Sequence, residues 1–150
     1  MEKNGNAITI KKTFSRTTTI SVIINADVSI IWKLLTNVSN FSRWNSTILS
    51  IEGEIVLGGR IKLKNYLDPK RTFKLKIKEI IPQKKIVWGD SMGSRTFTLE
   101  ESGTGGVLFV MTEKIGSILF PLFANKIPSF DESFEKYAED LKNEAELNKI

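Results

Sequence analysis

The strongest constraint on the fold is a change of hydrophobic period near the C-terminus. Between residues 47 and 115, apolar and polar side chains largely alternate, as in strands that bury one face and expose the other. After Pro128, apolar side chains instead recur every three or four residues, from Phe130 to Ala145. This predicts an antiparallel sheet followed by one helix of about twenty residues, roughly 30 Å long. Because no other large amphipathic element is available, we expect this helix to cover the apolar face of the sheet.

Local signals place the remaining elements. A β-branched run predicts a first strand over Thr17–Asn25, and Asp27 can cap a short helix over Val28–Thr36. A second short helix is expected over Val38–Trp44. Further strands are expected over 47–54, 60–66, 73 up to the turn at 82, 84–90, 94–102 and 107–115, which makes about six to seven in all. We expect residues 1–16 to form a polar tail or an extra edge strand, and residues 17–150 a single domain.

Composition excludes several classes of chemistry. The chain has neither cysteine nor histidine, so disulfides, thiolate chemistry and the commonest metal ligand are absent. We therefore expect no metal site and no cofactor. No apolar run approaches the length found in a signal peptide or a membrane span. This predicts a cytoplasmic protein without stable membrane insertion. The oligomeric state is left open between monomer and homodimer.

The outward face of the predicted sheet is basic. Lys62 and Lys64 alternate with apolar residues on one strand, and Lys74, Lys76 and Lys78 do so on the next. Nucleic-acid binding usually adds exposed aromatic residues between the basic ones, and here only Tyr66 is a candidate. We interpret the lysines as a solvated face that discourages edge aggregation, and expect no nucleic-acid partner.

Short motifs along most of the chain, from Thr17 to Lys142, resemble those of the SRPBCC superfamily, whose START-like and birch-allergen-like members include polyketide cyclases. The matching segments are Ala26-Asp27, Ile31-Trp32, Leu34-Leu35-Thr36, 41–45, Ile51-Glu52-Gly53, Gly58-Gly59-Arg60, 79–82, Ile86-Val87-Trp88, 97–100, 112–114, Gly116-Ser117 and 121–123. The resemblance implies an α+β helix-grip fold, in which a curved antiparallel sheet wraps around a long C-terminal helix and two short helices follow the first strand. It also implies a ligand cavity between sheet and helix.

Strand alternation and helical spacing nominate the residues of such a cavity. The apolar candidates are expected to point from the sheet or the helices into the space between them. They are Trp32, Trp44, Leu63, Phe73, Leu75, Ile77, Trp88, Phe97, Phe109, Met111, Phe130, Phe134 and Tyr137. Each of them could equally be ordinary core, and the tryptophans could simply pack beneath the sheet.

Polar candidates share the inward phase. Arg95 is in phase with Phe97, and Glu113 with Met111, so both charges should face the cavity from adjacent strands. A charge in apolar surroundings needs a partner, which predicts an Arg95–Glu113 ion pair that either orients a ligand or is purely structural. Asn65 has the same phase and could add a hydrogen bond.

The leading functional hypothesis is the binding or transport of a hydrophobic small molecule, such as a lipid, a polyketide or an aromatic metabolite. An alternative is a cyclase or dehydratase, for which Glu113, Arg95 and Tyr66 are the candidate catalytic residues, although the missing histidine counts against it. A third possibility, implied by the co-chaperone branch of the superfamily, is a protein-interaction module. An exposed apolar patch without an internal void would favour that reading.

Overall fold

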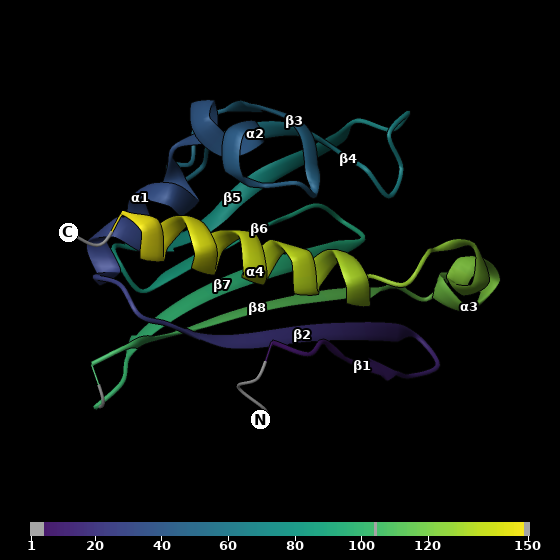
Figure 1. Cartoon of the computed structure of the whole chain (residues 1–150). Helices are drawn as coiled ribbons and strands as arrows, with labels where there is room; N and C mark the ends of the chain where they lie inside the picture. Colours follow the sequence, from purple (N-terminus) through teal and green to yellow (C-terminus); the bar gives the residue numbers. More distant parts are fainter. Residues whose placement is uncertain (1–4, 104, 149–150) are drawn as a thin grey trace.

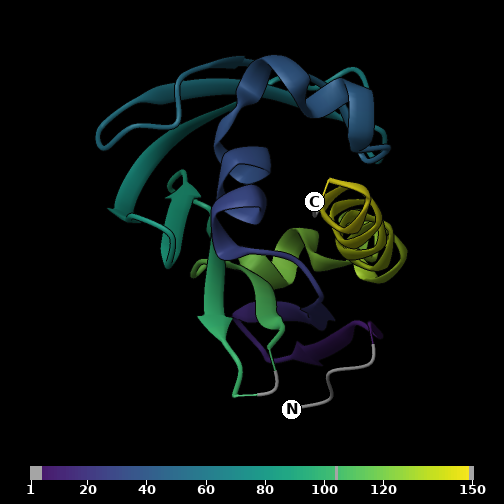
Figure 2. The same cartoon turned by 60° about the vertical axis from the view of Figure 1, so that its left-hand side comes forward.

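A computed structural model of the chain describes residues 5–103 and 105–148. The first four residues of the predicted tail, Thr104 in a predicted turn and the last two residues lie outside that range. Within it, the strands form one antiparallel sheet in the order β1-β2-β8-β7-β6-β5-β4-β3. The eight strands are β1 (Ile8–Lys11), β2 (Ser15–Ile24), β3 (Ile48–Gly53), β4 (Arg60–Asn65), β5 (Phe73–Ile81), β6 (Lys85–Gly89), β7 (Gly93–Glu101) and β8 (Val107–Gly116). The sheet curves around the last helix, α4 (Asp131–Leu147), and stays open (Figure 2).

The predicted fold class is confirmed, with one strand more than the six to seven expected. The additional strand is β1, which pairs with β2 from Ile8 opposite Thr19 to Lys11 opposite Arg16. The first predicted strand also begins earlier than Thr17, because β2 starts at Ser15 and places the Arg16 side chain in a buried position. The extra edge strand was one of the two alternatives for residues 1–16, whereas the earlier start of β2 and the burial of Arg16 were not expected.

Helices connect β2 to β3, as the sequence predicts. Helix α1 (Val28–Thr36) begins after Asp27, whose side chain accepts a hydrogen bond from the Ser29 amide at 2.8 Å. A 3-10 turn, η1 (Val38–Asn40), and helix α2 (Phe41–Trp44) follow and bury Phe41 and Trp44. The other short elements are α3 (Phe120–Phe123) and the 3-10 turn η2 (Ala124–Lys126), which lie between β8 and α4.

Helix α4 starts later than the spacing of Ser129 and Glu132 suggests. Phe130 occupies the N-cap position. The Ser129 hydroxyl accepts a hydrogen bond from the Asp131 amide at 3.2 Å, so Ser129 and Glu132 do not form a capping box around an N-cap serine. The helix buries the stripe Phe134, Tyr137, Ala138, Leu141 and Ala145 against the sheet.

Polar contacts fix α4 on both sides. Ser46, before β3, donates to Asp140 through its amide and hydroxyl, while Lys142 donates to the Ile23 carbonyl in β2 at 2.8 Å. At the start of the helix the Ala7 amide donates to Glu135 at 2.9 Å, and Thr9 on β1 donates to Asp131. The helix is thereby held across the open side of the sheet (Figure 1). No helix in the described ranges combines the length and apolar character needed to cross a bilayer.

Candidate functional site

A cavity of about 240 Å³ lies between the sheet and the start of α4. Its apolar walls come from Leu63 and Leu75 on neighbouring strands, Trp88 on β6 and Phe130 before the helix. These positions follow from strand alternation, since Leu63 and Phe73 are register partners in β4 and β5. The β5–β6 register shifts between Ile77 and Glu79, and such irregularities bend a strand, in keeping with the curvature of the sheet around this space.

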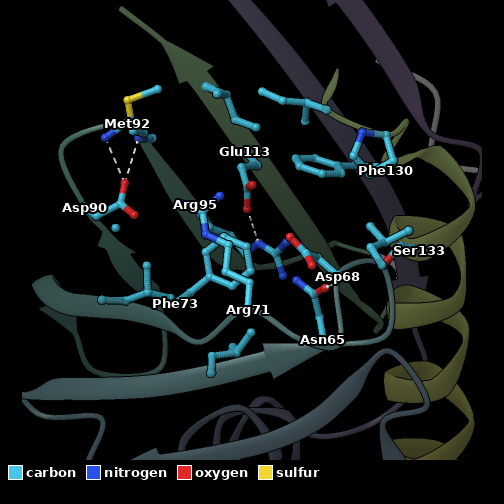
Figure 3. A pocket seen from close by; sticks show the side chains of 18 of the residues that line it. Asn65, Asp68, Arg71, Phe73, Asp90, Met92, Arg95, Glu113, Phe130 and Ser133 are labelled. Atoms are coloured by element: carbon cyan, nitrogen blue, oxygen red, sulfur yellow. Dashed lines mark hydrogen bonds and ion pairs between the residues drawn. The ribbon is translucent and has the colours of Figure 1, made fainter. Parts of the chain in front are cut away.

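The Arg95–Glu113 ion pair forms as the sequence predicts and lines the cavity (Figure 3). The two residues are register partners in β7 and β8, and Arg95 Nε donates to Glu113 Oε1 at 2.6 Å. Their side chains are only 15% and 18% exposed. The Arg95 guanidinium also lies 4.9 Å from the centre of the Phe134 ring on α4. Carboxylate and ring together hold the guanidinium in a fixed place on the cavity wall.

One rim of the cavity is formed by turns at a single edge of the sheet. Asn65 ends β4 and accepts a hydrogen bond from the Asp68 amide at 3.0 Å, which shapes the turn that also carries Arg71. The Arg71 guanidinium lies 4.5 Å from the centre of the Phe73 ring. In the β6–β7 turn, Asp90 accepts from the amides of Met92 and Gly93 at 2.8 and 3.1 Å. These side chains surround the opening in Figure 3.

The segment between β8 and α4 forms the opposite rim. Phe123, Lys126, Ile127 and Pro128 line the cavity there. Arg16 fastens this segment to β2 by donating to the carbonyls of Ile127 and Pro128 at 3.2 and 2.8 Å. Its guanidinium lies 4.6 Å from the centre of the Phe130 ring. Burial lowers the pKa of Arg16, with Glu113 and Asp131 acting in the opposite direction.

The structure divides the residues nominated from the sequence into two groups. One group lines the cavity: Leu63, Asn65, Phe73, Leu75, Trp88, Arg95, Glu113 and Phe130. The other packs in or against the hydrophobic core without lining it: Trp32, Trp44, Ile77, Phe97, Phe109, Met111, Phe134 and Tyr137. Tyr66 is 58% exposed and is not among the lining residues.

Tyr137 is almost fully buried within the core group. Its ring packs against Trp44, Phe97 and Phe109 at centroid distances of 6.0, 5.9 and 6.4 Å. Its hydroxyl is buried and has no hydrogen-bond partner in the part of the chain that the structure describes. Burial raises the pKa of this hydroxyl, an effect that the nearby Arg95 charge partly opposes.

The lining residues that the sequence reasoning missed lie in turns, at the ends of strands, in the short helical elements before α4 and at the start of α4. They are Thr47, Ile48, Leu67, Asp68, Arg71, Gly89, Asp90, Met92, Gly93, Ser94, Ile115, Phe123, Lys126, Ile127, Pro128 and Ser133. A usable signal existed, because alternate turns of an antiparallel meander meet at the same edge of the sheet. The ends of β4, β6 and β8 therefore converge, and the turns that follow them enclose the same space.

Together, the open curved sheet, the gripping C-terminal helix and the cavity between them define a protein of the SRPBCC superfamily, as the sequence motifs predicted. More narrowly, residues 25–146 match the sequence model of the family described as "Activator of Hsp90 ATPase homolog 1-like protein". The chain belongs to this family. No curated protein matches the chain.

Solved structures share the fold at low sequence identity. Protein MLL2253 from Mesorhizobium loti is 16% identical, with a TM-score of 0.69 over 90% of this chain and 100% of that one. Protein NE0264 from Nitrosomonas europaea is 13% identical, with a TM-score of 0.68 over 89% of this chain and 95% of that one. DynU16, from the dynemicin biosynthetic locus, is 12% identical, with a TM-score of 0.68 over 89% of this chain and 48% of that one. These likenesses show the fold, which commonly binds hydrophobic ligands.

Proposed function

We propose that this protein binds a compact, mostly apolar small molecule with one polar group in the cavity between its sheet and α4. The observation that carries the proposal is the combination of apolar walls with a fixed Arg95–Glu113 pair inside the same cavity. Ligand sites commonly combine hydrophobic walls with a few polar groups that set orientation. Burial of the ligand would supply the affinity, at roughly 25 cal/mol per Å² of apolar surface before entropic costs.

The size of the cavity narrows the class of ligand. At about 240 Å³, the cavity lies just below the range of roughly 300–1,000 Å³ that is usual for sites of drug-sized ligands. That space suits a one- or two-ring metabolite or a short acyl chain better than a whole membrane lipid. Such a ligand would place its apolar part against Leu75 and Trp88 and its polar group towards Arg95.

Binding without turnover is the simpler proposal. Of the three candidate catalytic residues, Glu113 and Arg95 are hydrogen-bonded to each other, and Tyr66 does not line the cavity. A general acid or base must reach the atom whose proton it moves, and an exposed Tyr66 is poorly placed to do so. The family's name describes activation of an ATPase, which is a protein-interaction role. We favour a small-molecule role because it gives the cavity a purpose.

Filling the cavity tests the proposal. Leu75→Trp should place a larger ring in the cavity and weaken the binding of anilinonaphthalene sulfonate, a fluorescent probe with an apolar ring system and one anionic group, by at least about tenfold, which is about 1.4 kcal/mol. Lys74→Trp adds the same ring to the exposed face of β5 and serves as the matched control. Thermal unfolding of both variants should remain cooperative. Equal probe affinity for the wild type and a folded Leu75→Trp protein would contradict binding in this cavity.

A further inference from the structure

The segment between β8 and α4 has two faces of different character. Phe120 is buried, and its ring contacts Phe123 at a centroid distance of 5.7 Å on the side that closes the cavity. Ile118 and Leu122 point the other way, with 85% and 77% of their surface exposed. Leu119 is 58% exposed. A short stretch therefore presents three large aliphatic side chains to solvent, which is unusual for a surface with no partner.

A fourth apolar side chain joins these three. Phe14, in the turn between β1 and β2, is 56% exposed, and its carbonyl accepts a hydrogen bond from the Ser117 amide at 3.2 Å. The β1–β2 turn and α3 lie at the same end of the molecule, where α3 projects beyond the strands (Figure 1). We call the group formed by Phe14, Ile118, Leu119 and Leu122 the apolar tip.

The charges that flank the apolar tip have one sign. Residues 3–26 and 114–130 contain no Asp or Glu, whereas Lys11, Lys12, Lys114 and Lys126 fall within them. All four lysines are exposed.

Nearby acidic groups are engaged inside the molecule. Glu113 pairs with Arg95, Asp131 accepts from Thr9, and Asp90 accepts from two backbone amides. Asp68 belongs to the β4–β5 turn, which lines the cavity on another side.

We propose that the apolar tip and its four lysines form a docking surface for an anionic phospholipid membrane. The projecting aliphatic side chains would enter the boundary between headgroups and acyl chains, while the lysines would lie among the anionic headgroups. Charge complementarity favours this partner, because the apolar tip and its lysines match an anionic lipid layer, while the nearby carboxylates of Glu113, Asp131 and Asp90 have partners within the described chain. The docking surface does not depend on the proposed function. A role in loading the cavity, whose wall includes the adjoining Phe123 and Ile127, does rest on it.

Vesicle flotation tests the docking surface. The wild-type chain should float with vesicles of phosphatidylcholine containing about a third phosphatidylglycerol, and far less with phosphatidylcholine alone. Raising salt from 0.1 to 1 M should release it, because the Debye length falls from about 10 to about 3 Å. Ile118→Ser combined with Leu122→Ser should weaken partitioning by at least about tenfold, because two apolar side chains are lost. Lys11→Gln combined with Lys12→Gln should weaken it less and reduce the salt dependence.

Leu147→Ser is the matched control, because Leu147 is as exposed as Leu122, at 77%, and lies at the far end of α4. It should float like the wild type. The proposal is overturned if the wild type does not float, or if the Ile118/Leu122 variant floats equally well. It is also overturned if flotation does not depend on phosphatidylglycerol. In each case, a protein partner for the apolar tip becomes the better account. Probe binding to the cavity, measured on the same variants, should be unchanged, so failure of docking is distinguishable from failure of ligand binding.

Discussion

At the scale of single residues, Arg95 is held between an acid and an aromatic ring. Glu113 fixes its Nε at 2.6 Å, and the Phe134 ring lies beneath the guanidinium. Because both charges are mostly removed from water, the loss of one partner leaves the other poorly solvated. The Arg95–Glu113 pair therefore contributes both to the stability of the sheet and to the polarity of the cavity wall.

Arg95→Ala should therefore affect both folding and binding. We expect the free energy of unfolding to fall by about 1–3 kcal/mol, because Glu113 is left without its charged partner. Affinity for the natural ligand should fall by about tenfold, or 1.4 kcal/mol, if the guanidinium orients its polar group. Glu79→Gln, which disrupts the exposed pair with Lys85 at 3.3 Å, is the control and should change neither quantity. Denaturant titration and ligand titration measure the two effects, and wild-type affinity in Arg95→Ala would exclude the orienting role.

Tyr137→Phe should be tolerated at neutral pH. Its hydroxyl has no partner among the described residues, so we expect the free energy of unfolding to stay the same or rise by up to about 1 kcal/mol. The raised pKa means that the folded chain keeps this proton at pH values where the unfolded chain loses it. The contribution of the Tyr137 hydroxyl to the free energy of unfolding is complete below the pKa of about 10 in the unfolded chain. It is lost as the pH rises above that value. Urea titrations at several alkaline pH values should show a shallower loss for Tyr137→Phe, and a large loss at neutral pH would contradict this account.

At the scale of elements, the segment from β8 to α4 depends on one side chain. Arg16 reaches from β2 to two consecutive carbonyls of that segment and packs over Phe130. The fork of a guanidinium can bond both carbonyls at once, whereas a lysine ammonium cannot reproduce that geometry.

Arg16→Lys should loosen this rim of the cavity. We expect a loss of about 1–2 kcal/mol in the free energy of unfolding and faster amide exchange across residues 117–130. Arg43→Lys alters the exposed contact with Glu144 at 2.6 Å and should leave exchange in that segment unchanged. Exchange followed by mass spectrometry measures both variants. Protection of residues 117–130 equal to that of the wild type would show that the segment is held by other contacts.

Elements with a clear hydrophobic period could be predicted from the sequence, and features defined by long-range contacts could not. The helix over Val28–Thr36 matches its prediction because its cap and its apolar stripe are both local signals. Strand β1 was only an alternative, because it is mostly exposed at the edge of the sheet and its hydrogen bond from Thr9 to Asp131 spans 122 positions. The inward phase of Arg95 and Glu113 was visible in the alternation. The roles of Arg71 and Asp90 were not, because turns have no hydrophobic period. The role of Arg16 was not, because its partners Ile127 and Pro128 are more than a hundred positions away.

At the scale of the whole molecule, the cavity follows from the way the sheet is covered. Eight strands in the described chain curve around one helix, and the buried stripe of α4 fills the space from Phe134 to Ala145. The stripe does not extend before Phe134, and just ahead of it Phe130 and Ser133 line the cavity instead. The core is therefore solid along most of the helix and hollow at its start. That hollow lies where the turns after β4, β6 and β8 converge.

The most direct test of the central claim is native mass spectrometry of the protein purified from its own host. The account predicts that the wild type and Lys74→Trp carry a small molecule of the same mass, which is released on denaturation. Leu75→Trp, purified in the same way, should have the mass of the bare chain. An identical bound mass in Leu75→Trp, or a wild type that carries nothing and binds no apolar probe, would contradict a ligand-binding cavity between the sheet and α4.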